Sequence, residues 1–219
     1  MISWVITTFN IIVCSIMFFT VFKLPYSAIG GVLFFVSQVS VLVSGFLVTN
    51  SDPKDITPEE NISLDFSKLV CTVCMVNVNP GTKHCSLCNK CIAQFDHHCS
   101  WLNNCIGGTN LKWYLCLVFS LEVNLLCIMG FGALGLYYYS ELGVLLWMVT
   151  LESGLVAVVN TYLLSFNLWL YSKGMTTYEY TVSRQSKVLE ETKQKTSKDN
   201  QPPVVLGPSI ILSTEAKFN

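Results

Sequence analysis

Charged side chains are scarce in this chain of 219 residues. They make up 12% of the sequence, with 52% hydrophobic residues, whereas soluble domains usually contain about 25% charged residues. Thirteen basic and fourteen acidic residues give a net charge of −1, without the basic excess that a nucleic-acid-binding domain shows. Histidine is rarer still, with three residues in the whole chain. The composition therefore argues against a nucleic-acid binder and favours a membrane protein.

Long apolar stretches account for the composition. Four segments have the length of membrane-spanning helices, which need about 20 apolar residues, and they cover about 3–22, 26–49, 113–139 and 142–172. The last two contain Glu122 and Glu152, for which a polar contact between spans is a simpler explanation than a functional role. No internal repeat is apparent. We expect an all-α membrane protein with four transmembrane helices.

The basic residues indicate the orientation of these spans. Of the thirteen, only Lys23 falls in a connection between the first and second or the third and fourth segments. Because Lys and Arg concentrate on the cytoplasmic side, the loop at 50–112 and the tail after 172 should both face the cytosol. The glycosylation sequon at Asn61 would then stay away from the lumen.

Residues 71 to 105 contain seven cysteines and all three histidines. Clustered Cys-x2-Cys pairs with interleaved histidines favour metal binding in a reducing compartment over disulfides. Two tetrahedral zinc ions would use eight of the ten side chains. The remaining two can be one cysteine and one histidine, which is a nucleophile with its base. The spacing alone does not assign the ligands.

Asp96-His97-His98-Cys99 within this cysteine frame resembles the DHHC family of membrane protein S-acyltransferases (palmitoyltransferases). The similarity continues through Trp101, Asn103, Asn104 and Cys105, and resumes at Thr176-Thr177-Tyr178-Glu179. A weaker match is Asp52-Pro53, where the family often has a following glycine and this chain has Lys54.

The resemblance implies a specific assignment of the ligands. One zinc would bind Cys71, Cys74, His84 and Cys91, and the other would bind Cys85, Cys88, His98 and Cys105. Cys99 would be the nucleophile and His97 its base, with Asp96 orienting His97 and Thr176 hydrogen-bonded to Asp96. The implied reaction moves a palmitoyl group from acyl-coenzyme A to Cys99, and then to a cysteine of a membrane-associated substrate protein.

The expected domains follow the chain in order: helices one and two at 1–49, a cytosolic linker and two-zinc domain at 50–112, helices three and four at 113–173, and a cytosolic tail at 174–219. The endoplasmic reticulum or Golgi is the implied location, and an accessory subunit is a possible partner. Beyond about residue 181 the polar composition favours disorder over a segment that folds back.

Several alternatives stay open. The cysteine cluster could be a purely structural zinc module, or Cys99 could bind zinc while another cysteine is free. The protein could also be a zinc-bearing membrane adaptor without transfer activity, although an adaptor has no need of Asp96, His97 and Cys99. A RING-type ubiquitin ligase is disfavoured by the order of the ligands.

Overall fold

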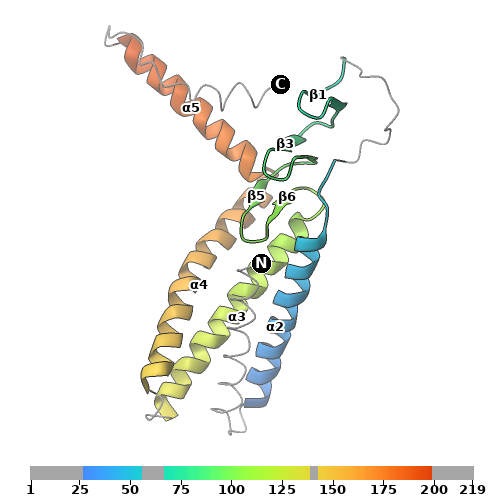
Figure 1. Ribbon diagram of the computed structural model, residues 1–219. Coiled ribbons are helices and arrows are strands. Elements are labelled where there is room, and N and C mark those ends of the chain that lie inside the picture. Colours follow the sequence, from blue (N-terminus) through green and yellow to red (C-terminus); the bar gives the residue numbers. More distant parts are fainter. Residues whose placement is uncertain (1–26, 56–66, 139–142, 199–219) are drawn as a thin grey trace. The chain divides into compact units, whose positions relative to one another are not determined.

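The computed structural model describes residues 27–55, 67–138 and 143–198 (Figure 1). The first predicted span, residues 3–22, and the end of the tail lie outside these ranges. The chain divides into two compact units. The first holds membrane-type helices and includes Asn110–Trp169, and the second holds short hairpins and a helix and includes Asp52–Thr109 and the residues from Leu170 onward.

Three predicted spans form long helices in the first unit: α2 (Ser27–Asn50), α3 (Leu111–Tyr138) and α4 (Gly143–Ser172). Each contains a stretch long and apolar enough to cross a membrane, at Gly30–Asn50, Leu111–Tyr137 and Leu146–Ser172. The helix α2 ends shortly before Pro53, which lacks the N–H that a further helical turn would require. The prediction of helical spans is therefore confirmed for three of the four segments.

Polar contacts join the membrane helices. The Glu122 carboxylate on α3 accepts hydrogen bonds from Asn160 Nδ2 (2.8 Å) and Thr161 Oγ1 (2.7 Å) on α4. This is the polar contact between spans that we expect for Glu122 from the sequence. Glu152, in contrast, is exposed on α4. Two further hydrogen bonds join α2 to α3: Asn124 Nδ2 to Ser37 Oγ at 3.1 Å and Ser40 to Ser120 at 2.6 Å.

Three antiparallel hairpins follow one another in the second unit. They consist of β1 (Val70–Cys71) with β2 (Val76–Asn77), β3 (Lys83–Cys85) with β4 (Lys90–Ile92), and β5 (His97–Cys99) with β6 (Asn104–Ile106). Equivalent pairs face each other across them: Val70 with Asn77, His84 with Cys91, and His98 with Cys105. The hairpins thus recur every fourteen residues, which corrects the expectation of no internal repeat; most side chains between the recurring positions differ.

The hairpin unit has a small apolar core. Cys85, Ile92 and Cys105 form one buried cluster in it, and Leu102 and Ile106 are buried as well. The chain leaving α2 joins the unit through Asp55, whose N–H donates to the carbonyl of Cys91 (2.8 Å). The Asp55 carboxylate accepts hydrogen bonds from the Asn79 N–H (3.0 Å) and the Thr82 hydroxyl (2.6 Å). Hydrogen bonds and cysteine clusters therefore carry much of the cohesion that a larger core would provide.

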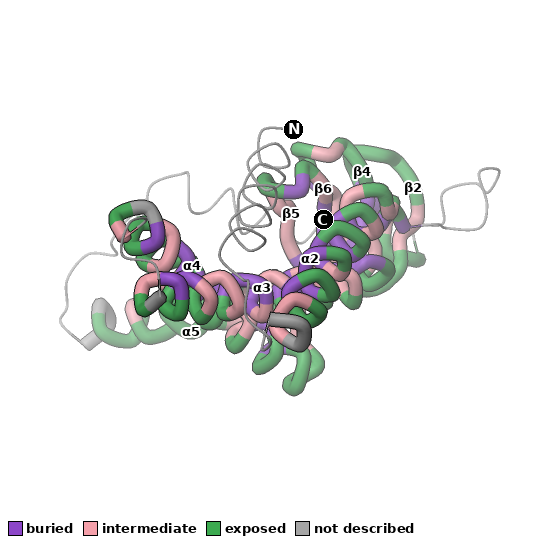
Figure 2. The backbone as a smooth tube through the Cα atoms, turned by 90° about the horizontal axis from the view of Figure 1, so that it is seen from below, coloured by how far each residue is buried: buried purple, intermediate pink, exposed green. Residues whose placement is uncertain are grey.

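A helix, α5 (Thr177–Lys198), completes the second unit. The helix α4 ends at Ser172, and the positive φ of 63° at Gly174 lets the Met175 N–H reach back to the carbonyl of Leu170 (3.1 Å). This is a Schellman motif, which ends α4 and frees the chain to start α5. The expected disorder beyond residue 181 is wrong as far as Lys198, although exposed residues predominate along this helix (Figure 2).

Candidate active site and zinc centres

Two groups of four side chains could each hold a metal ion. Within each group the potential ligand atoms all lie within 4.8 Å of one another. The first group is Cys71, Cys74, His84 and Cys91, and the second is Cys85, Cys88, His98 and Cys105. The structure therefore brings together the same two sets of four that the family resemblance implies.

The hairpins build both groups in the same way. A Cys-x2-Cys pair lies at the turn of one hairpin, and a histidine and a cysteine face each other across the next hairpin. In the first group this facing pair is His84 and Cys91, and in the second it is His98 and Cys105. Each metal ion would consequently tie one hairpin to the next.

The donor atoms fit zinc. His84 Nδ1 lies 3.3 Å from Cys74 Sγ, and His98 Nδ1 lies 3.4 Å from Cys88 Sγ and 3.6 Å from Cys105 Sγ. Tetrahedral zinc, with bonds of about 2.0–2.3 Å, holds its ligands at about this separation. Burial, with neighbouring thiols, raises the pKa of Cys91 and Cys105 above the ordinary value. A bound cation would reverse that shift, because it stabilises thiolates.

Strand β5 places the candidate catalytic residues, His97 and Cys99, on the opposite face from the candidate zinc ligand His98. Side chains alternate between the two faces of a strand, so His97 and Cys99 share one face while His98 points to the other. His98 reaches the second zinc group, and His97 and Cys99 remain outside both groups. The alternation explains physically how neighbouring histidines could serve different purposes.

Asp96, His97 and Cys99 form a hydrogen-bonded series. His97 Nδ1 donates to Asp96 Oδ2 at 2.7 Å, and the His97 ring is also hydrogen-bonded with the Cys99 side chain. Asp96 is buried, with 4% of its surface exposed. Burial raises the pKa of Asp96, but the hydrogen bonds from His97 and Thr177 outweigh it and leave that pKa below its usual value.

The pKa values of the other two groups move toward an ion pair. Burial disfavours the charged His97 ring, but the hydrogen bonds with Asp96 and Cys99 prevail and raise the pKa of His97 to about 9. Burial also opposes the Cys99 thiolate, yet contacts with His97 and with the Leu102 and Trp101 N–H groups lower the pKa of Cys99. The contacts therefore shift both groups toward their charged forms, a Cys99 thiolate beside a His97 imidazolium.

Thr177, rather than Thr176, contacts Asp96. The Thr177 N–H donates to Asp96 Oδ1 at 2.8 Å. Thr176 instead caps α5: its hydroxyl accepts from the Glu179 N–H (3.1 Å), and the Glu179 carboxylate accepts from the Thr176 N–H (2.9 Å). This reciprocal pair is a capping box. The predicted hydrogen bond from Thr176 is corrected accordingly, because the first helical residue presents its N–H to the carboxylate.

Tyr178 adds a contact that sequence reasoning missed. Its ring meets Phe95 edge-on, with centroids 5.7 Å apart, and Lys83 Nζ lies 5.4 Å from the ring centre. Phe95 directly precedes Asp96 in the chain. The aromatic pair therefore holds the start of α5 against the segment that carries Asp96, and only the position of Tyr178 between Thr177 and Glu179 hints at it.

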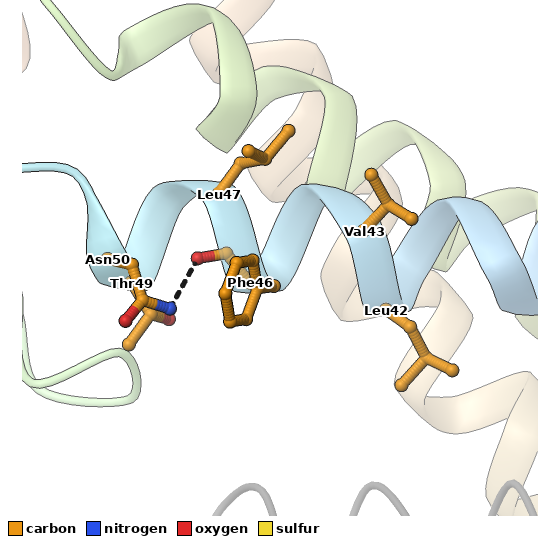
Figure 3. Close-up of a pocket in the computed structure, with 6 residues that line it drawn as sticks. All are labelled: Leu42, Val43, Phe46, Leu47, Thr49 and Asn50. Atoms are coloured by element: carbon orange, nitrogen blue, oxygen red, sulfur yellow. Dashed lines mark hydrogen bonds between the residues drawn. The ribbon is translucent and has the colours of Figure 1, made fainter.

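An apolar hollow of about 500 Å³ lies along the C-terminal half of α2 (Figure 3). Its lining residues are Leu42, Val43, Phe46, Leu47, Thr49 and Asn50. Asn50 Nδ2 donates to the carbonyl of Phe46 at 2.8 Å, which satisfies a polar group at one end of the hollow. The rest of the described lining is almost wholly hydrocarbon.

Comparisons with known proteins agree with these observations. The DHHC palmitoyltransferase family model matches residues 65–184. Human palmitoyltransferase ZDHHC5 is 34% identical over 114 residues, which cover 50% of this chain and 16% of that protein. Probable protein S-acyltransferase 7 of Arabidopsis thaliana is 33% identical over 129 residues, covering 53% of this chain and 29% of that protein. The chain thus spans less than a third of the length of these curated relatives.

Proposed function

Because this chain belongs to the DHHC palmitoyltransferase family, we propose that it is a protein S-acyltransferase that moves a palmitoyl group from acyl-coenzyme A to cysteines of substrate proteins. One observation carries the proposal: Cys99 lies outside both candidate zinc groups and is hydrogen-bonded to His97, which is held by Asp96. No comparable observation favours the adaptor hypothesis.

The first chemical step forms an acyl-enzyme. The Cys99 thiolate attacks the thioester carbonyl carbon, a new carbon–sulfur bond forms, and the bond to the coenzyme A sulfur breaks. The departing thiolate can take a proton from the His97 imidazolium. Little energy separates one thioester from another, so the protein mainly has to position the reactants and keep Cys99 ionised.

The second step regenerates the enzyme. A cysteine thiol of the substrate protein gives its proton to neutral His97 and attacks the acyl-Cys99 thioester, and the Cys99 thiolate leaves. The Asp96 carboxylate stabilises the imidazolium each time it forms. Asp96 in turn is fixed by the Thr177 N–H.

Zinc has a structural role in this proposal. The two sets of ligands would bind one ion each, and each bound ion would cross-link neighbouring hairpins. The acyl transfer itself uses Cys99, His97 and Asp96. Thr176 would contribute indirectly, through the capping box that sets the start of α5.

The membrane helices supply the surroundings that a fatty chain requires. The apolar hollow on α2 is suited to a hydrocarbon chain. We include in the proposal a fourth span at 3–22 and the four domains as predicted. We also propose that the hairpin unit and both termini face the cytosol, which the distribution of Lys and Arg supports. An endomembrane location and an accessory subunit rest on the family resemblance alone.

Self-acylation tests the proposal. The purified protein and a Cys99→Ala variant are incubated with an alkyne-tagged palmitoyl-coenzyme A, and zinc is counted in both. We expect a hydroxylamine-labile label on the unaltered protein only, with about two zinc ions per chain in each. Absence of label on the zinc-loaded, unaltered protein would contradict the proposed activity.

A further inference from the structure

The turn after Cys99 resembles, in length and backbone conformation, the two turns that carry the Cys-x2-Cys pairs. Each hairpin has a four-residue turn, at 72–75, 86–89 and 100–103. A cysteine precedes every turn: Cys71, Cys85 and Cys99. A non-glycine residue with positive φ ends every turn: Met75 (53°), Asn89 (50°) and Asn103 (50°). Because side chains disfavour this conformation, its occurrence three times indicates one shared loop geometry.

The cysteine sulfur meets equivalent backbone groups in the first and third turns. The Cys74 N–H donates to Cys71 Sγ at 3.4 Å, and the Val73 N–H makes a further contact. The N–H groups of Trp101 and Leu102, two and three residues after Cys99, contact Cys99 Sγ in the same way. Backbone N–H donors stabilise an anionic acceptor, whether that sulfur binds a metal ion or attacks a substrate.

The third turn differs at one internal position. The third residue of the turn is Cys74 in the first hairpin and Cys88 in the second, but Leu102 in the third. Leu102 is buried, with 9% of its surface exposed. Its side chain cannot bind a metal ion, so the third turn offers the Cys99 thiol alone.

The third turn also has no hairpin after it. In each of the two metal groups, the histidine lies ten residues beyond the second cysteine of the Cys-x2-Cys pair: His84 follows Cys74, and His98 follows Cys88. Ten residues beyond Leu102 is Lys112, in the first turn of helix α3 (Leu111–Tyr138). A row of three hairpins therefore makes two metal groups and leaves the last turn without its facing pair.

We propose that the Cys99 loop is a third metal-binding turn converted to catalysis, and that Leu102 keeps soft metal ions off the nucleophile. The inference rests on the proposed function of Cys99. A second thiol at position 102 would complete a Cys-x2-Cys chelate beside His97, which already contacts Cys99. Two thiols and an imidazole are a known set of zinc ligands, and a metal-bound Cys99 sulfur would no longer be free to attack the acyl donor.

The test compares Leu102→Cys with Leu102→Ser, which removes the same apolar volume without adding a thiol. Both full-length variants are purified with their zinc, kept reduced with a phosphine, and given one equivalent of Cd²⁺. Bound metal is counted, and thiolate-to-cadmium absorption is recorded. We expect Leu102→Cys to bind one more ion than Leu102→Ser and to lose self-acylation by more than about tenfold, because coordination masks the thiolate nucleophile. A chelator too weak to remove structural zinc should restore the label.

Equal metal counts in the two folded variants would overturn the proposal, whatever their activity. If Leu102→Cys loses structural zinc and fails to fold, a Leu102→His variant replaces it, because an imidazole at position 102 is also a metal ligand. The absorption and exchange kinetics of Cd²⁺ on Leu102→His are then compared with those on Leu102→Ser. Failure of the unaltered protein to self-acylate would contradict the proposed function. The extra ion would still decide whether the loop is a metal-binding turn.

Discussion

The hairpin unit and the membrane helices are stabilised by different interactions. The apolar core of the hairpin unit is small, and cysteines supply two of the three residues of its buried cluster. In the helical unit, long apolar helices are joined by side-chain hydrogen bonds such as those of Glu122 with Asn160 and Thr161. Metal coordination contributes more free energy per contact than hydrogen bonds between membrane helices do.

The difference determines how each unit should respond to a single substitution. Loss of a metal ligand would remove a cross-link that the proposed zinc ions provide between hairpins, so folding and activity should fail together. A lost hydrogen bond between membrane helices removes one of several parallel contacts, because the intact apolar helices remain in the bilayer. We therefore expect large effects in the hairpin unit and small ones among the helices.

Removing a zinc ligand should have the largest effect. In His84→Ala, the first metal group loses its imidazole, and structural zinc sites of this kind contribute about 10–16 kcal/mol of binding free energy that is coupled to folding. We expect loss of at least one zinc ion, faster amide hydrogen exchange across the hairpins, and no detectable self-acylation. Zinc content and hydrogen exchange are the measurements.

The control for that experiment is Cys116→Ser. Cys116 is exposed on α3 and belongs to neither metal group, so both zinc ions should remain. If His84→Ala also retained both ions with normal hydrogen exchange, the assignment of His84 as a ligand would be wrong.

Replacing the base should separate catalysis from folding. His97→Ala removes the partner of Cys99 but leaves both metal groups intact, so zinc content should be unchanged. Self-acylation at neutral pH should slow about 10²–10⁴-fold, the usual contribution of a positioned acid or base. Loss of one zinc ion in this variant would indicate that His97 and His98 have exchanged roles.

The pH profile sharpens this prediction. The lowered pKa of Cys99 means that the unaltered enzyme holds a larger share of Cys99 as thiolate at a given pH than a free thiol does, and that its activity falls as acid protonates that thiolate. Without His97, the rate should rise only near the ordinary thiol pKa of about 8.5. The raised pKa of His97 also implies a contribution to stability that is full below pH 6.5 and is lost as the pH rises through about 9. Coinciding rate profiles for the two proteins would refute the proposed ion pair.

A smaller effect is expected from removing the N–H that holds Asp96. Thr177 is the first residue of α5, a position that accepts proline. Thr177→Pro should therefore keep the helix while deleting the N–H donor to Asp96 Oδ1 together with the Thr177 hydroxyl, which also hydrogen-bonds Asp96. A hydrogen bond to a charged group is worth about 1.5–3 kcal/mol, so we expect self-acylation to slow at least about tenfold.

Thr177→Val is the matched control, because it also removes the hydroxyl and its hydrogen bond to Asp96 but retains the N–H, so the difference between the two variants reports the N–H alone. Circular dichroism should show equal helix content in both variants. Equal rates for the two would mean that the backbone donor is not needed to position Asp96.

The membrane spans and the residue types of the metal ligands could be predicted from the sequence. Hydropathy located the three spans within a few residues, because each must provide about 20 apolar residues in a row. The cluster of cysteines and histidines indicated metal ligands by residue type. The fourteen-residue offset from Cys71 to Cys85 and from His84 to His98 was also readable and would have partitioned the ligands, but the residues between them are dissimilar and hide it.

Other features depend on three-dimensional contacts. The Thr-Thr-x-Glu motif indicated an interaction with Asp96, but which threonine makes it depends on the start of α5. The helix begins at Thr177 because Thr176 and Glu179 cap each other, and the Schellman motif at Gly174 directs the chain into position. Likewise, Glu122 and Glu152 look alike in sequence, and only the packing of α3 against α4 distinguishes them.

The smallest expected effect lies among the membrane helices, where that pair of carboxylates provides a matched comparison. Glu122→Ala removes two hydrogen bonds between α3 and α4. Such bonds average about 0.6 kcal/mol each in membranes, so the free energy of unfolding should fall by about 1 kcal/mol, with zinc content and self-acylation nearly unchanged. Glu152→Ala removes an exposed carboxylate whose presence in a span is itself unfavourable, so stability should stay equal or rise. Thermal unfolding in detergent micelles measures both. A loss from Glu122→Ala as large as that from His84→Ala would show that the helical unit depends on single contacts as strongly as the hairpin unit does.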